Sequence, residues 1–144
     1  MDDHPIVRQG LAQLINHEKD LMICGEAANA REAIERLHQM KPEFLIVDIC
    51  LKDGMDGIEL IKTIRTRNTS LPILVVSMHD ESLYAERALR AGSLGYIMKE
   101  EAIEQVIVAI RRVINGEIFL SDKMKGKRKM DRFSIVTTTA CILW

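Results

Sequence analysis

The chain has 144 residues, of which 47% are hydrophobic and 28% are charged, and its formal net charge is −1 at pH 7. This length is enough to bury one hydrophobic core and too short to promise two, so we expect a single globular domain. The near-neutral charge excludes a bulk attraction to nucleic acid or to an anionic membrane, and no stretch reaches the ~18 apolar residues that a membrane span needs.

The first half of the chain alternates helical and strand-like patterns. Apolar residues at intervals of three and four predict an amphipathic helix over residues 5–17, and a short apolar run predicts a strand over residues 21–27. Asn29, with a glutamate three residues later, is a suitable N-cap for a second helix. The next apolar run, residues 44–47, is continuous, as in a strand covered on both faces, and it stops at Asp48.

The second half repeats this alternation. Two further apolar runs predict strands over residues 73–76 and 95–98, and these runs stop at Ser77 and Lys99 respectively. The clearest helix covers residues 103–114, where apolar residues form a continuous stripe. Two more helices are predicted between the strands, over residues 58–64 and 80–91.

The order of these elements predicts the fold class and the domain boundary. Strands that alternate with helices and lack in-and-out periodicity are typical of an α/β protein with a parallel sheet between two layers of helices. The composition changes after residue 116, so we divide the chain into a domain over residues 1–116 and a linker and tail over residues 117–144. The basic cluster in this tail lacks interleaved aromatic residues, which favours a solvated linker over a nucleic-acid site.

Three of the predicted strands end in a polar residue: Asp48, Ser77 and Lys99. Because the carboxyl ends of parallel strands form the ligand crevice of such sheets, we expect these side chains to converge. The acidic pair Asp2 and Asp3, just before the first helix, would join them if it follows a strand end. Clustered carboxylates attract a cation, and Mg²⁺ prefers oxygen ligands.

These residue types suit phosphoryl transfer. With a cation present, the Asp48 carboxylate would act as a nucleophile toward phosphorus, Lys99 would neutralise phosphoryl charge, and Ser77 would donate a hydrogen bond to a phosphoryl oxygen. Each residue alone has a simpler interpretation, since Asp and Ser are common turn or cap residues and a lysine usually solvates a surface. Their joint position at strand ends favours a functional site.

Five short segments form a specific combination. They are residues 2–5 (DDHP), 44–48 (FLIVD), 57–60 (GIEL), 75–79 (VVSMH) and 95–99 (GYIMK). Together they resemble the receiver domain of two-component response regulators, in the group joined to LuxR-type helix-turn-helix output domains, and the likeness covers roughly residues 1–123. The resemblance implies a flavodoxin-like, doubly wound parallel sheet of strand order 2-1-3-4-5, with helices on both faces.

The resemblance also implies a phosphoacceptor and a metal site. Asp48 would accept the phosphoryl group. Asp3, Asp48 and the backbone carbonyl of Cys50 would ligate Mg²⁺, and Asp2 would hold the ion through a water molecule.

Further residues match the family's switch and interaction surfaces. Ser77 and Tyr96 resemble the switch pair, in which the hydroxyl moves toward the phosphoryl group and the aromatic ring follows inward. Lys99 resembles the phosphate-binding lysine. The face between Glu81 and Ile114 resembles the surface that the family uses for homodimerisation and output.

The sequence departs from the family at both ends. The first strand, an apolar run before the acidic pair, is missing, because the sequence starts at Met1, so the first strand of the predicted fold is truncated. Residues 116–121 resemble the interdomain linker, but those that follow do not resemble a DNA-binding domain. We therefore expect a fragment or an altered form of a longer protein, which would contact DNA only through an output domain absent here.

These features predict a signalling switch and not an enzyme. The chain would take a phosphoryl group from a sensor histidine kinase, and it would regulate transcription in its full-length form. A phosphohydrolase of the aspartyl-phosphate type is disfavoured, because Cys50 stands where its second aspartate would be. An FMN-binding flavodoxin is disfavoured, because Asp2 and Asp3 would repel phosphate. A phosphorylation-independent interaction module remains open, and its lack of Mg²⁺ affinity would distinguish it.

The three cysteines bear on the cellular setting. Cys24, Cys50 and Cys141 lie far apart and form no C-x-x-C pair, which predicts neither a zinc site nor a disulfide framework. With no export signal at the N-terminus, this pattern favours a reduced, cytoplasmic protein with no membrane partner.

The missing first strand leads to an expectation about the tail. In the family this strand is central, and an empty slot would forgo about four buried aliphatic side chains at ~1.5–3 kcal/mol each. That loss approaches the whole stability of a domain, ~5–15 kcal/mol. Ile135, Val136 and residues 137–139 favour extended structure. We therefore predict that the segment from about Phe133 to Cys141 fills the slot, the alternative being a disordered tail.

Overall fold

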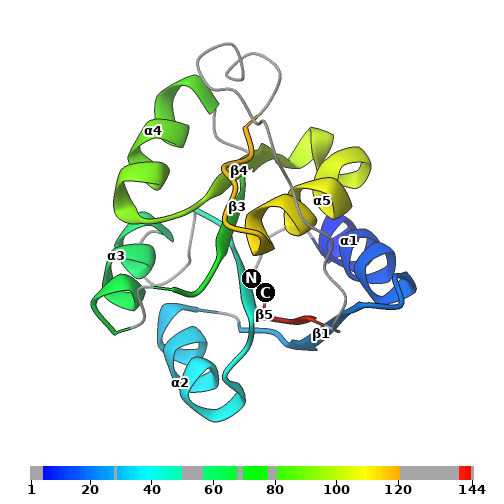
Figure 1. The fold of residues 1–144 in the computed structure, drawn as a ribbon, viewed down its shortest axis with the longest axis horizontal. Helices are drawn as coiled ribbons and strands as arrows, with labels where there is room; N and C mark the ends of the chain where they lie inside the picture. Colours follow the sequence, from blue (N-terminus) through cyan, green and yellow to red (C-terminus); the bar gives the residue numbers. More distant parts are fainter. Residues whose placement is uncertain are drawn as a thin grey trace.

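The computed structural model describes residues 5–27, 29–49, 57–67, 70–77, 81–120 and 140–143. Figure 1 shows the elements that these residues form. The helices are α1 (Pro5–His17), α2 (Ala30–Met40), α3 (Gly57–Arg67), α4 (Glu81–Ala91) and α5 (Lys99–Ile114). The strands are β1 (Leu21–Gly25), β2 (Phe44–Val47), β3 (Ile73–Ser77), β4 (Gly95–Met98) and β5 (Ala140–Leu143). Within the described ranges, no helix is both long and apolar enough to cross a membrane.

The strands form one parallel sheet in the order β1-β5-β2-β3-β4. In Figure 1, α2, α3 and α4 lie along one side of this sheet, and α1 and α5 lie along the other. With β5 counted as the first strand of the predicted receiver fold, β1 to β4 are its second to fifth strands, and the order is 2-1-3-4-5. The doubly wound α/β fold expected from the sequence is therefore confirmed.

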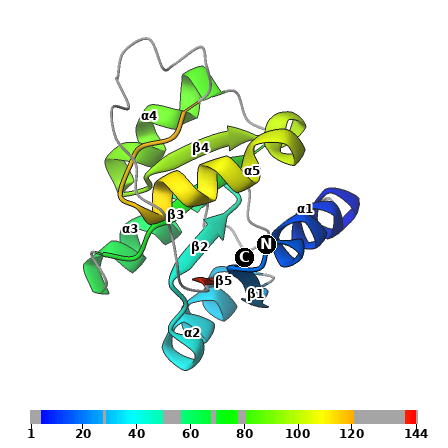
Figure 2. The ribbon, with the colours of Figure 1, turned by 45° about the vertical axis from the view of Figure 1, so that its right-hand side comes forward.

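Strand β5 occupies the central slot of the sheet, between β1 and β2. It is parallel to β1, with Met22 opposite Cys141, and parallel to β2, with Phe44 opposite Ile142. Figure 2 shows β5, in red, between these two strands. The predicted insertion of the tail is thus confirmed, but the predicted segment, about Phe133 to Cys141, overlaps the strand Ala140–Leu143 only at Ala140 and Cys141. Residues 131–139 lie outside the described part of the chain.

Alternate residues of the central strands face opposite helical layers. In β2, Phe44 and Ile46 pack with α1 and α5, whereas Leu45 and Val47 pack with α2, α3 and α4. All four side chains are buried. This two-sided burial explains why the apolar run of β2 is continuous instead of alternating, as a parallel sheet between two layers requires.

The helix ends follow the capping signals in the sequence. The Asn29 side chain accepts a hydrogen bond from the Glu32 backbone N–H at 2.9 Å, which confirms the predicted N-cap of α2. At the end of α4, Gly92 has a φ of +126° and donates its N–H to the Ala88 carbonyl at 3.2 Å. A side chain is rarely tolerated at such a φ, so glycine suits this helix end.

Residues just beyond the predicted boundary at 116 continue the packing of the domain. Phe119 forms a parallel bridge with Gly95, and its carbonyl accepts the Tyr96 N–H at 3.0 Å. Phe119 and Leu120 are buried. The division of the chain at residue 116 remains a prediction, but the segment we assigned to the linker contributes side chains to both cores.

Arg111 of α5 holds the turn between α1 and β1. Its Nη2 atom donates to Glu18 Oε1 at 2.7 Å, and its guanidinium donates to both carboxylate oxygens of Asp20. The hydrogen bond from Arg111 lowers the pKa of Asp20 below its ordinary value, and the same contacts raise the pKa of Arg111. The three side chains are about two-thirds buried or more. We therefore expect this cluster to contribute more to stability than an ordinary surface ion pair does.

One cysteine corrects the prediction from the sequence. Cys24 in β1 is disulfide-bonded, so the expectation of reduced cysteines with no disulfide framework is wrong for this residue. Its partner side chain lies outside those that the structure describes. Spacing along the chain could not have indicated this bond, because the fold decides which distant segments lie side by side.

The role of β5 can be tested at Ile142, which is in register with both Ile23 and Phe44. We expect the free energy of unfolding of Ile142→Pro to be about 1–3 kcal/mol lower than that of Ile142→Ala, the cost of leaving a buried backbone group without its hydrogen bond. The reason is that proline removes a backbone donor and does not fit a central strand. Urea denaturation of both variants measures this difference. Equal stability of the two variants would show that the tail is not part of the sheet.

The Arg111 cluster predicts a dependence of stability on pH. Arg111→Gln should lower the free energy of unfolding by about 1 kcal/mol at pH 7. Because the pKa of Asp20 is lowered in the folded state, its contribution is complete above the ordinary aspartate pKa of about 3.9 and is lost as the pH falls through the folded value. The difference between wild type and variant should therefore shrink below about pH 4.

The matched control is Arg90→Gln, which breaks an exposed pair with Glu86 on α4. That change should cost only a few tenths of a kcal/mol, about what exposed pairs contribute. A difference between wild type and Arg111→Gln that stayed constant from neutral to strongly acid pH would contradict the assignment to Asp20.

Candidate functional site

Asp48 is the residue that directly follows the buried strand β2. The residue as a whole is 3% exposed, which is unusual for an aspartate. The chain returns to this point at Gly57, whose backbone N–H donates to the Ile49 carbonyl at 2.6 Å. A Cβ atom at Gly57 would lie 2.3 Å from the Asp48 carbonyl oxygen, so only glycine allows this close approach.

Lys99 reaches Asp48 from two strands away. Lys99 is the first residue of α5, directly after β4, and β3 lies between β4 and β2. Its Nζ atom donates to Asp48 Oδ2 at 2.8 Å, and the side chains are 3% and 4% exposed respectively. Neighbouring strands are about 4.8 Å apart, so the long lysine side chain spans the end of β3 to reach the carboxylate.

Ser77 stands at the end of the strand between them. It is the last residue of β3 and is fully buried, and it lies in register with Met98, the residue before Lys99. The sheet therefore brings the ends of β2, β3 and β4 to one edge, as the sequence predicted for Asp48, Ser77 and Lys99.

Tyr96 lies in β4, whose carboxyl end is at this edge, but its side chain belongs to the hydrophobic core. Its ring is fully buried and packs in the cluster that contains Val75, Ala85 and Ala88. Val75 is its register partner on β3. The ring therefore occupies the inward position, in the layer covered by α2, α3 and α4.

The remaining predicted site residues are not placed. Asp2, Asp3 and Cys50 lie outside the described residues, so their proposed part in a metal site stays a prediction. The described ranges contain no group of three or more His, Cys, Asp or Glu side chains that could hold a metal ion. The buried Asp48 carboxylate is the kind of oxygen donor that Mg²⁺ prefers, so the residue that is placed fits the ion.

The arrangement brings a nucleophile and a cation together in a water-poor setting. A carboxylate and an ammonium group at 2.8 Å interact strongly when both are buried. This attraction offsets the free-energy cost of removing each charge from water. The Lys99 ammonium would also attract a negatively charged group that approaches the carboxylate, since a lysine on a flexible stem serves as a mobile point charge.

The sequence did not reveal the contact that Gly57 makes. Gly57 was visible only as one residue of a family-like segment, and a glycine in a loop is usually there for a turn. The physical reason, a backbone approach to Asp48, depends on where α3 begins relative to the end of β2. No pattern in the sequence reports that distance.

The buried pair predicts a coupled effect on stability. Lys99→Met should lower the free energy of unfolding by about 3–5 kcal/mol, because it removes the positive charge that faces the buried Asp48 carboxylate. Combining it with Asp48→Asn should restore a large part of that loss, and urea denaturation of the three variants measures the coupling. Additive losses would mean that the two groups do not stabilise each other.

Comparison with known proteins places this site in a family. Residues 1–111 match the response regulator receiver domain. The chain is 32% identical over 123 residues to the oxygen regulatory protein NreC of Staphylococcus haemolyticus. The matched region covers 85% of this chain and 57% of that protein. The chain thus spans little more than half the length of that relative.

Solved structures agree with the sequence comparison. A two-component response regulator of the LuxR family from an Aurantimonas species has a TM-score of 0.80 and 33% identity, covering 87% of this chain and 89% of that one. The non-phosphorylated receiver domain of the stress response regulator RcsB from Escherichia coli has a TM-score of 0.76 and 27% identity, covering 84% and 94%. The chain therefore belongs to the response regulator receiver domain family, in the group of LuxR-type regulators.

Proposed function

We propose that this receiver domain is a phosphoacceptor switch that a sensor histidine kinase phosphorylates on Asp48. The observation that carries the proposal is the buried contact between Lys99 Nζ and Asp48 Oδ2 at 2.8 Å. The buried Ser77 at the neighbouring strand end supports it, because its hydroxyl is a donor of the kind that phosphoryl oxygens bind.

The proposed reaction is a transfer between two side chains. A carboxylate oxygen of Asp48 attacks the phosphorus of a phosphohistidine on the kinase, the new O–P bond forms, and the P–N bond breaks. The leaving imidazole takes up a proton from solvent. The Lys99 ammonium group then moves from the carboxylate to a phosphoryl oxygen, and the Ser77 hydroxyl donates a hydrogen bond to another phosphoryl oxygen. Hydrolysis of the acyl phosphate restores Asp48, so the domain resets itself and turns over no external substrate.

Mg²⁺ is the cofactor that this chemistry needs. Asp3, Asp48 and the Cys50 carbonyl would hold it, with Asp2 acting through a water molecule. When bound, the ion offsets negative charge on the phosphoryl group as it approaches the carboxylate. Asp48 and Lys99 keep their roles as nucleophile and as charge partner.

Ser77 and Tyr96 would couple phosphorylation to a change in the conformation of the domain surface. The Ser77 hydroxyl would follow the phosphoryl group, and the buried Tyr96 ring supports an inward state of the switch. The face between Glu81 and Ile114 would then pair with a second copy. It includes Ile103 and Val108 of α5, which are 49% and 48% exposed.

The full-length protein would regulate transcription through a separate output domain. The LuxR-type relatives support this role, and any contact with DNA would belong to that domain. We place the chain in the cytoplasm, where it would meet the catalytic part of its kinase.

Phosphorylation of Asp48 is directly testable. Treatment of the full chain with acetyl phosphate and Mg²⁺ should add one phosphoryl group, detected by intact-mass spectrometry. Asp48→Asn should abolish the added mass, because the amide nitrogen is not a nucleophile toward phosphorus. Chelation with EDTA should abolish it as well.

The control is Asp20→Asn, which removes a carboxylate at the far end of the domain and should leave the labelling intact. Labelling that persists in Asp48→Asn would place the phosphoacceptor elsewhere. A chain that is folded by circular dichroism but neither binds Mg²⁺ nor becomes labelled would instead be a phosphorylation-independent interaction module.

A further inference from the structure

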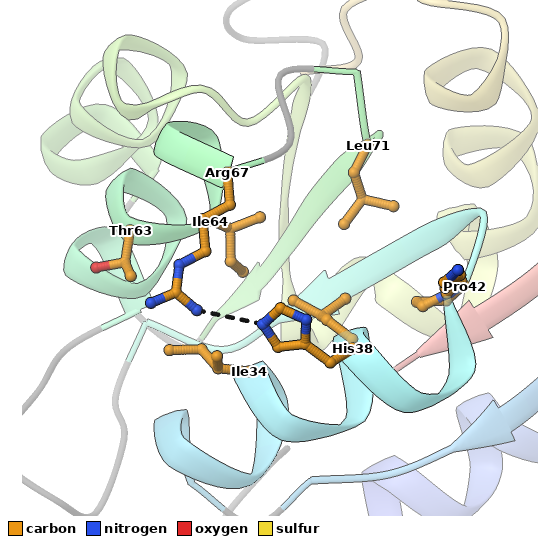
Figure 3. A pocket seen from close by; sticks show the side chains of 9 residues that line it. Ile34, His38, Pro42, Thr63, Ile64, Arg67 and Leu71 are labelled. Atoms are coloured by element: carbon orange, nitrogen blue, oxygen red, sulfur yellow. Dashed lines mark hydrogen bonds between the residues drawn. The ribbon is translucent and has the colours of Figure 1, made fainter.

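A hollow of about 430 Å³ lies between α2 and α3. Figure 3 shows the side chains that line it. Two of them, Pro42 and Leu71, precede β2 and β3, so the hollow lies at the amino ends of these strands. Asp48 follows the opposite end of β2, so the hollow is separate from the proposed phosphorylation site. Its volume falls in the ~300–1,000 Å³ range of small-molecule sites.

The floor of the hollow is apolar. Ile64 and Leu71 are buried, and Ile34 and Leu37 are half-buried against the same core. These side chains come from α2, α3 and the approach to β3, so the floor is built on the body of the domain. An aliphatic or aromatic group that entered would be removed from water, which is favourable in proportion to its apolar area.

The rim of the hollow is basic. His38, Lys41 and Arg67 are exposed residues that line it, and the lining includes no aspartate or glutamate. Arg67 Nη1 lies 3.4 Å from His38 Nε2, the contact drawn in Figure 3. An arginine side chain only donates hydrogen bonds, so His38 Nε2 is the acceptor in this contact. In the part of the chain that the structure describes, neither Lys41 nor Arg67 forms an ion pair with a carboxylate.

Lys41 stands where the backbone favours glycine. It caps the end of α2 with φ 48° and ψ 59°, and its N–H donates to the Leu37 carbonyl at 3.1 Å. Among the described residues it is the one non-glycine with a positive φ. Helices that end in this conformation usually place Gly or Asn there, because a side chain is strained. Strain of this kind gathers at binding sites, where the side chain has a use.

We propose that this hollow binds a small amphipathic anion, a carboxylate with an aliphatic tail. The tail would lie on Ile34, Leu37 and Ile64, and the carboxylate would meet the Arg67 guanidinium and the Lys41 ammonium at the rim. A guanidinium binds a carboxylate through two parallel hydrogen bonds, and the His38 contact occupies one of its nitrogens without neutralising its charge.

The probe for this site is octanoate, titrated into the full chain by isothermal calorimetry and by amide NMR. We expect saturable binding with a Kd of roughly 0.1–1 mM, which suits a ligand of this size. The shifted amides should belong to α2, α3 and the approach to β3. Acetate, which lacks the tail, and 1-octanol, which lacks the charge, should each bind at least about tenfold more weakly, because each loses one half of the recognition.

Two variants test the rim. Arg67→Gln should weaken octanoate binding about tenfold, since it removes a charge-assisted hydrogen bond. Lys41→Gly should weaken binding while raising the melting temperature, because glycine relieves the backbone strain. These opposite signs separate a lost binding group from damage to the fold.

Arg90→Gln on α4 is the matched control for the charge change and should bind octanoate as the wild type does. Asp48→Asn should also bind normally, which keeps this result independent of the phosphorylation proposal. The proposal is overturned by no saturable octanoate binding, by 1-octanol binding as tightly as octanoate, or by Arg67→Gln binding no worse than Arg90→Gln.

Discussion

The structure depends on the central strand of its parallel sheet, because the strands on either side form their hydrogen bonds with it. β1 and β2 share no register with each other, and each pairs instead with β5. A gap at this place would leave a row of backbone N–H and C=O groups without partners in the interior, and buried groups of this kind cost about 1–3 kcal/mol each. The four residues Ala140–Leu143 therefore connect β1 to the rest of the sheet, although they lie more than a hundred residues away along the chain.

A continuous sheet is also what assembles the site. Asp48, Ser77 and Lys99 each follow or end a strand, and the order β2-β3-β4 places these ends side by side. The lysine ammonium lies 2.8 Å from the carboxylate, and this contact offsets the desolvation of the two charges at this edge. The pair thus stabilises the domain only while the strands keep their positions, and the same pair gives the carboxylate its proposed chemistry.

Sequence patterns predicted the features that depend on local order. The bounds of α1, β2 and β4 agree with the predicted ones, because apolar periodicity and strand length specify them. The fold class and the strand-end residues followed in the same way. The patterns did not indicate that Gly57 approaches Asp48, that Cys24 is disulfide-bonded, or that Ile103 of the α5 stripe is exposed. Each of these depends on which distant segments meet, and neither composition nor spacing encodes that.

The tail shows both the strength and the limit of such reasoning. An empty central slot would be costly, and the residues after Gly116 were the ones that the predicted elements left unassigned. Local propensity then pointed to the Thr-rich stretch of residues 135–139, whereas the strand in the described residues begins at Ala140. Register in a sheet is set by the partners on both sides, here Ile23 and Phe44 opposite Ile142, and not by the propensity of the inserted segment alone. Because β5 pairs with Phe44 and Leu45, and Asp48 follows three residues after Leu45, the docking of the tail fixes the short strand that carries the proposed phosphoacceptor.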